Sequence, residues 1–181
     1  MIQLDTSWLQ HVQKPARYTG GEYNSIVKDH STVDVTMALA FPDVYEVAMS
    51  HLGIKILYGL VNRRDDAAAE RVFAPWHDME EEMRKRNIPL FSLETRTPIK
   101  DFDVLAFTLQ YEMSFTNILN MLDLAGIPMY AKDRDMDFPL LVCGGPCAFN
   151  VEPIADFFDI VSLGESEEWG DEFIDLYKAE K

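Results

Sequence analysis

The fold of this chain follows from one stretch, Leu140-Leu141-Val142-Cys143-Gly144-Gly145-Pro146-Cys147-Ala148-Phe149-Asn150. A short apolar run ends abruptly in two glycines and a proline, and residues 151–158 then predict a short helix. This pattern is typical of a buried strand that gives way to a helix at the ligand-binding edge of an α/β sheet. Glycine suits such an edge because, without a Cβ atom, its backbone can lie flat against a bulky ligand.

Strand and helix patterns alternate along the rest of the chain. β-branched and apolar residues predict further strands at residues 33–42, 72–74, 103–109 and 160–163. Helical spacing of apolar residues, or a run of charged helix formers, predicts helices at residues 49–61, 78–86, 114–125 and 169–179. Ser50 is the expected N-cap of the first helix, and Gly126 the residue that ends the third.

This alternation predicts one α/β domain over residues 32–181. We expect a flavodoxin-like, doubly wound sheet of five parallel strands, Rossmann-like in its right-handed crossovers, with helices on both faces. Residues 1–31 are interpreted as an N-terminal arm, because residues 14–24 are polar and rich in turn formers, with a short helix expected at residues 7–12. The sequence leaves open whether the arm packs on this domain or on a downstream one.

Composition excludes several classes of protein. The chain is 48% hydrophobic, which argues against global disorder, and it has no apolar run long enough to span a membrane. A formal net charge of −15 argues against nucleic-acid binding by this segment, because phosphate binding needs clustered Lys and Arg. Neither a signal peptide nor a disulfide framework is evident, so we expect a cytoplasmic protein.

Ligands of such sheets bind beyond the carboxyl ends of the strands. Four predicted loops lie there, at residues 42–51, 108–115, 144–150 and 164–167. The first contains no G-x-G-x-x-G dinucleotide fingerprint, and the chain contains no G-x-x-x-x-G-K-[ST] phosphate loop. These absences remove the two commonest nucleotide-binding interpretations.

The order of these loops resembles the cobalamin-binding domain that precedes the catalytic barrel in B12-type radical SAM enzymes, over roughly residues 33–181. The features that carry the resemblance are Leu52-Gly53 at a helix start, Gly144-Gly145 with Glu152-Pro153 shortly after it, and Gly164-Glu165-Ser166-Glu167 after the last strand. In the family the Pro-Glu pair has the opposite order, and a glycine stands where this chain has Ser166. The stretches Pro15-Ala16-Arg17-Tyr18 and Phe41-Pro42-Asp43-Val44-Tyr45-Glu46 resemble a bacterial branch of these proteins.

The resemblance implies a cobalamin-binding domain of a larger enzyme that is not catalytic by itself. S-adenosylmethionine and a [4Fe–4S] cluster would belong to a downstream radical SAM domain, which is the expected partner and which we expect to follow Lys181. The corrin ring would rest on the loops around Ser50 and Thr108, and the nucleotide tail would enter a slot beside Gly144-Gly145. The residues implied to bind the cofactor are Ser50, His51, Thr108, Gln110, Tyr111, Gly144, Gly145, Pro146, Gly164 and Glu165.

Two tempting motifs are incomplete. His51 lacks the Asp-x-His-x-x-Gly context of a cobalt-ligating histidine, because Asp43 lies eight residues before it and Gly53 only two after it. Cys143 and Cys147 have the spacing of the first two ligands of a radical SAM cluster, but Asn150 stands at the third position and the chain has only two cysteines. We therefore predict no metal ligand and no catalytic residue in this segment.

A second hypothesis remains open from the sequence. The domain could keep the cobalamin-domain fold without the cofactor and serve as an interaction or lid module for the catalytic barrel. A bulky side chain such as Phe149 filling the slot beside Gly145 would favour this hypothesis. A flavodoxin-like FMN protein or a phosphate receiver is disfavoured, because the loop after the first strand has neither a Ser/Thr-rich phosphate loop nor an acidic pair.

Overall fold

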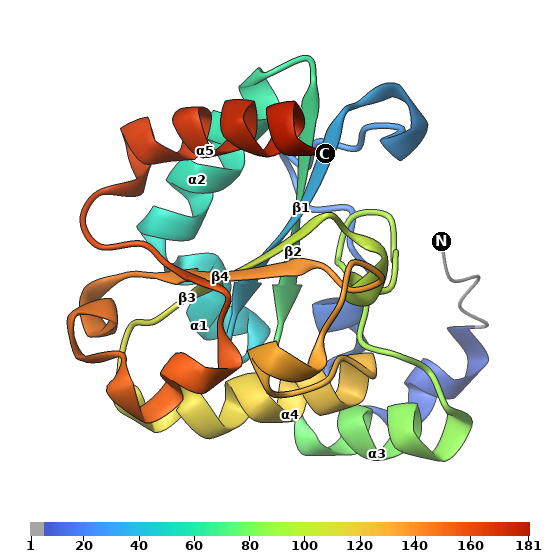
Figure 1. Ribbon diagram of the computed structural model, residues 1–181. Coiled ribbons are helices and arrows are strands. Elements are labelled where there is room, and N and C mark those ends of the chain that lie inside the picture. The colour runs from blue at the N-terminus through green and yellow to red at the C-terminus, as the bar shows by residue number, and fades with distance from the viewer. Residues whose placement is uncertain (1–5) are drawn as a thin grey trace.

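The computed structural model describes residues 6–181, and a parallel sheet forms its centre (Figure 1). The five strands are β1 (Val35–Phe41), β2 (Ala67–Phe73), β3 (Val104–Thr108), β4 (Leu140–Gly144) and β5 (Ile160–Val161). Their order in the sheet is β2-β1-β3-β4-β5, and every neighbouring pair is parallel. This is the strand order of the flavodoxin-like doubly wound fold, so the predicted fold class is confirmed.

Two pairs of helices cover the two faces of the sheet (Figure 1). One face carries α2 (Leu52–Arg63) and α5 (Ser166–Glu180), and the other carries α3 (His77–Arg86) and α4 (Phe115–Ala125). Since successive strand residues point to opposite faces, each strand contributes to two separate cores. In β1, Met37 and Leu39 belong to the α2/α5 core, whereas Ala38 and Ala40 belong to the α3/α4 core.

Shorter elements make up the connections. A brief helix, α1 (Tyr45–Ser50), follows β1. The remaining elements are one-turn or two-turn 3₁₀ helices, namely Thr6–His11, Pro15–Tyr18, His30–Thr32, Ile99–Asp101, Glu112–Ser114, Ala131–Asp133, Pro146–Asn150 and Glu152–Phe157.

The helix expected at residues 49–61 is present as α2, but it begins at Leu52, and the expectation that Ser50 is its N-cap is wrong. Two helices occupy this region, and His51 separates them with an extended backbone (φ −79°, ψ 122°). Ser50 is the last residue of α1, and its hydroxyl donates to the Glu46 carbonyl at 2.7 Å, so it is not available to cap α2. At this break the His51 side chain contacts Gln110, which is distant in sequence.

Other boundaries also differ from the sequence-based expectations. The segment expected to be a helix at residues 151–158 is the 3₁₀ helix Glu152–Phe157, a form that suits short connections. Strand β2 begins at Ala67, five residues earlier than expected, because pairing with β1 overrides the low strand preference of its alanines. Helix α5 begins at Ser166 rather than at residue 169, and β5 is shorter than expected.

The N-terminal arm packs on this domain. Trp8, Leu9 and Val12 are buried in the same cluster as the α3 and α4 side chains. The guanidinium group of Arg86 on α3 lies 5.7 Å from the centre of the Trp8 ring. The arm therefore forms part of the α3/α4 core.

A second part of the arm covers the outer edge of β2 through buried polar contacts. His30 Nε2 lies 2.7 Å from the carboxylate of Glu70, which also accepts hydrogen bonds from Ser92 and Thr95. Burial alone would raise the pKa of Glu70, but the hydrogen bonds from His30, Ser92 and Thr95 outweigh it and lower the pKa. The backbone of β2 at this edge is engaged by other groups, since Lys28 Nζ donates to the Ala67 carbonyl at 2.7 Å and the Leu93 N–H donates to the Arg71 carbonyl at 2.7 Å, and these contacts protect the edge strand.

Candidate functional site

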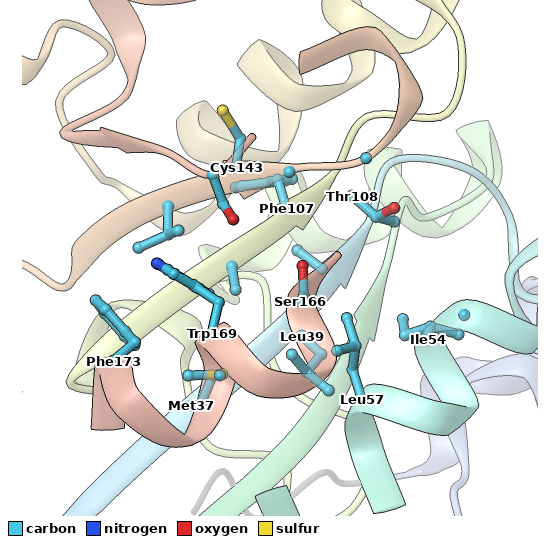
Figure 2. A pocket seen from close by; sticks show the side chains of 18 of the residues that line it. Met37, Leu39, Ile54, Leu57, Phe107, Thr108, Cys143, Ser166, Trp169 and Phe173 are labelled. Atoms are coloured by element: carbon cyan, nitrogen blue, oxygen red, sulfur yellow. The ribbon is translucent and has the colours of Figure 1, made fainter. Parts of the chain in front are cut away.

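A cavity of about 240 Å³ lies between the sheet and helices α2 and α5, toward the carboxyl ends of the strands (Figure 2). This volume is slightly below the lower end, about 300 Å³, of typical ligand pockets. Its walls are mainly apolar and come from three directions: Met37 and Leu39 on β1, Ile54 and Leu57 on α2, and Trp169 and Phe173 on α5. Parallel α/β sheets bind their ligands at this end.

The cavity exists because small residues stand where larger ones would fill the core. Ala106 lies in the middle of β3 and stays half-buried, although its neighbours Leu105 and Phe107, on the other face, are fully buried. Gly144 at the end of β4 and Gly170 on α5 also line the space. Apolar side chains around this space therefore lack the close packing that a protein interior normally has. A core that keeps such a space open therefore points to a ligand.

A chain of hydrogen-bonded side chains forms part of the rim. His51 Nε2 lies 3.1 Å from Gln110 Oε1, within hydrogen-bond distance. Gln110 Nε2 in turn donates to Thr108 Oγ1 at 2.5 Å. The His51 ring also packs against Phe41, with 5.2 Å between ring centres. The structure thus brings together residues that the sequence separates by more than fifty positions.

Gly53 makes room for this imidazole. A Cβ atom at position 53 would lie 2.9 Å from His51 Cε1, which is closer than side chains tolerate. Nδ1 of His51 is buried and has no hydrogen-bond partner among the described residues. Gly53 therefore has a packing role beside His51, at the start of α2.

The two glycines after β4 do different things. Gly144 has ordinary space around it, since a Cβ atom there would come no closer than 3.5 Å to Ser162. Gly145 has φ +112°, and a Cβ atom there would lie 2.9 Å from the Leu109 carbonyl oxygen. Gly145 is thus required by the backbone and by its packing on the end of β3, whereas Gly144 leaves room on the cavity side.

The last loop closes the site on the α5 side. Gly164 has φ +107° and precedes Glu165, which is exposed just before α5 begins. Both residues line the cavity, together with the hydroxyl-bearing residues Ser162 and Ser166.

The structure gathers most of the residues expected to bind a cofactor. Those that line the cavity are His51, Thr108, Gln110, Gly144, Gly145, Gly164 and Glu165. The other three do not line it: Ser50 is exposed at the end of α1, Pro146 begins a 3₁₀ helix, and Tyr111 points to Asp43. The hydrogen bond from Tyr111 to Asp43, together with partial burial, raises the pKa of Tyr111 to about 12.

Sequence reasoning missed the apolar walls. Ile54, Leu57, Ala106, Trp169 and Phe173 look like ordinary core residues in the sequence. One signal was present: Trp169 and Phe173 are four residues apart, so a helix places both rings on one face. The slot is also not filled by Phe149, whose side chain is 76% exposed.

Neither cysteine is activated. Burial raises the pKa of Cys143 to about 12. Burial and the nearby carboxylate of Glu112 raise the pKa of Cys147. Among the described side chains, no three His, Cys, Asp or Glu residues converge as a metal site would require. None of the helices in residues 6–181 is both long and apolar enough to cross a membrane.

Comparison with known proteins relates the chain to a protein family and to a curated relative. A family model described as "Radical SAM proteins, N-terminal" matches residues 53–181. The chain is also 28% identical over 134 residues to "Uncharacterized protein MJ0966" of Methanocaldococcus jannaschii. That alignment covers 72% of this chain and 24% of the relative, so the chain spans about a quarter of the length of this curated relative.

Proposed function

The chain belongs to the radical SAM proteins, and we propose that it is the cobalamin-binding domain of a longer member of that family. S-adenosylmethionine and the [4Fe–4S] cluster would be bound elsewhere in the longer protein, in a radical SAM domain that is the natural partner of this one. Bound cobalamin supplies a cobalt centre that can carry a methyl group. The described part of this chain offers no activated thiol and no cluster of metal ligands, so its own role is to bind and orient the cofactor.

The observation that carries this proposal is the apolar cavity at the carboxyl ends of the strands. Its depth, reaching Ala106 in the middle of the sheet, suits an apolar ring at the end of a long ligand. Gly144 and Ser162 would flank the nucleotide tail where it enters. The rim formed by His51, Gln110 and Thr108 would lie beneath the larger corrin ring.

The arrangement of His51 supports binding without a protein ligand to cobalt. Its Nε2 is engaged with Gln110, and its Nδ1 is buried. For either nitrogen to reach a metal, the ring would have to leave its contacts with Phe41 and Gln110. His51 is therefore proposed to shape the rim rather than to coordinate the metal.

Titration of the chain with cobalamin tests the proposal, followed by visible absorption and calorimetry. We expect saturable binding by the natural chain. Ala106→Leu places a larger apolar side chain in the cavity and should weaken binding by at least about tenfold, which corresponds to about 1.4 kcal/mol. Ala179→Leu makes the same change at an exposed position near the end of α5 and should leave the affinity unchanged.

The outcomes separate cleanly if circular dichroism shows that both variants are folded. Equal binding by the natural chain and by Ala106→Leu would mean that the cavity is not the site. No binding by the natural chain would contradict the proposal for this domain.

A second candidate is a docking module for the rest of the longer protein. It is favoured by large apolar side chains exposed in three segments at the carboxyl edge of the sheet, those of Leu52, Met113 and Leu163. This candidate predicts that the natural chain does not bind cobalamin. It also predicts that polar substitution of these three residues weakens association with the separately produced remainder of the protein.

A further inference from the structure

We infer that Trp169 determines ligand specificity by stacking on a flat heteroaromatic base inside the cavity. This inference rests on the proposed cobalamin function, and it names both the part of the ligand that enters and the side chain that selects it.

The aromatic wall of the cavity is flat. Trp169 and Phe173 lie one turn apart on α5, with 4.7 Å between ring centres and 19° between ring planes. Phe173 is buried, which fixes one ring, while Trp169 is half-buried and lines the cavity. Figure 2 shows both side chains extending from α5 on the side that faces the sheet. Because the two rings stack on one another, Phe173 covers one face of Trp169 and holds the indole in place at the cavity.

The sheet lines the cavity with Met37 and Leu39 from β1 and with smaller side chains from β3 and β4. Ala106 on β3 and Val142 on β4 line the cavity from the sheet, and Gly144 continues this wall toward the mouth. An aromatic wall that faces small aliphatic residues leaves a slot, which favours a planar group over a bulky saturated one. Offset stacking on an aromatic ring adds to the binding energy that burial alone provides.

The polar groups near the mouth suit a heterocycle. The Thr108 hydroxyl accepts a hydrogen bond from Gln110, so its own proton is available to a ring nitrogen. Ser166 lies close by, with its hydroxyl oxygen 3.9 Å from the point that a Cβ atom on Gly144 would occupy. The only formally charged residues that line the cavity are Glu165 and Glu167, within the described part of the chain. These carboxylates disfavour a dianionic phosphate monoester such as that of FMN.

Paired ligands and variants test the inference. The ligands are cobalamin, cobinamide (the same corrin without the nucleotide tail), free dimethylbenzimidazole and FMN. We expect the natural chain to bind cobalamin more tightly than cobinamide and to bind FMN weakly or not at all. Trp169→Leu removes the ring and should weaken cobalamin binding by about tenfold, the loss typical when a base loses its stacking partner, while cobinamide binding stays within about twofold.

Two further variants serve as controls. Trp169→Phe keeps an aromatic ring on Phe173 and should restore most of the cobalamin affinity, so it also serves if the leucine variant does not fold. Trp76→Leu removes a half-exposed tryptophan that does not line the cavity, and it should bind like the natural chain. Free dimethylbenzimidazole should change the tryptophan fluorescence of the natural chain and of Trp76→Leu, but not that of Trp169→Phe.

The inference and the proposed function fail in different ways. If Trp169→Leu weakens cobalamin and cobinamide equally, or weakens neither, the stacking role is overturned while cobalamin binding stands. If the natural chain binds no cobalamin but dimethylbenzimidazole still acts through Trp169, the proposed function fails and the slot for a flat base remains. Binding of FMN more tightly than cobalamin would overturn both.

Discussion

The two faces of the sheet are packed to different degrees, although the same strands supply both. On the α3/α4 face, Leu105 and Phe107 belong to one buried cluster with Met121 and Leu122. On the α2/α5 face, the residue between those two on β3 is Ala106, and it borders a cavity. Close packing is the normal state of a protein interior. The difference teaches that one face is built for stability and the other keeps room for a ligand.

The largest expected effect comes from opening the packed face. Leu105→Ala removes a side chain that is 0% exposed, and it should lower the free energy of unfolding by about 2–5 kcal/mol. Chemical denaturation measures this loss. Under conditions where the variant remains folded, its cobalamin affinity should match that of the natural chain. A loss of stability below about 0.5 kcal/mol would contradict the view that this face is closely packed.

The adjacent residue should respond with the opposite sign. Ala106→Leu adds apolar surface to an open cavity, and it should raise the free energy of unfolding by about 1–2 kcal/mol, since burying a whole leucine side chain yields about 1.5–3 kcal/mol. The same denaturation experiment measures the change, and Ala179→Leu is the control. If Ala106→Leu destabilises the chain, the space at this position is too small for the proposed ligand.

The pair of glycines after β4 sharpens the comparison. Gly145→Ala would be strained by its positive φ and by the Leu109 carbonyl, and should cost about 1–3 kcal/mol of stability. Gly144→Ala meets only ordinary contacts, so it should change stability little while reducing cobalamin affinity. Denaturation and titration of both variants measure the two effects. Equal stability losses for the two variants would show that both glycines are required by the backbone conformation, and that Gly144 has no separate role at the cavity.

A pH-dependent contribution is expected in β2, the outer strand of the sheet. The pKa of Glu70 is lower in the folded chain than its ordinary value of 4.5, so its ionised form stabilises the fold above that pH. This contribution is lost as the pH falls through the lowered pKa. Glu70→Gln should therefore be less stable than the natural chain at pH 7, and the gap should narrow in acid. If the difference in stability between the natural chain and Glu70→Gln stays constant from pH 7 into acid, the lowered pKa of Glu70 is contradicted.

The smallest effect is expected at the rim of the cavity. Because His51 is held by Gln110, His51→Ala should leave the visible spectrum of bound cobalamin unchanged. Absorption of the loaded natural chain and of the variant measures this directly. A spectral shift that marks the loss of an imidazole ligand would show that His51 coordinates cobalt after all.

Local patterns in the sequence were enough to predict the fold class. Alternating strand and helix signals, and the abrupt end of the apolar run at Gly144-Gly145, predicted a doubly wound parallel sheet with its ligand edge at the strand ends. These features depend on neighbours within one element, so their period can be read from the chain. The break between α1 and α2 was not predicted this way, and at the break His51 contacts Gln110, a residue that no local pattern could place beside it.

By itself, then, the sequence determined the class of fold and the edge of the sheet where the candidate site residues gather. Only the tertiary structure decided that this edge leads into a cavity, that Gly144 borders it freely while Gly145 is held by Leu109, and that Trp169 lines it. The physical reason is that a cavity belongs to no single element. It arises where small residues on β3 and β4 face side chains from α2 and α5, and only folding brings those segments together.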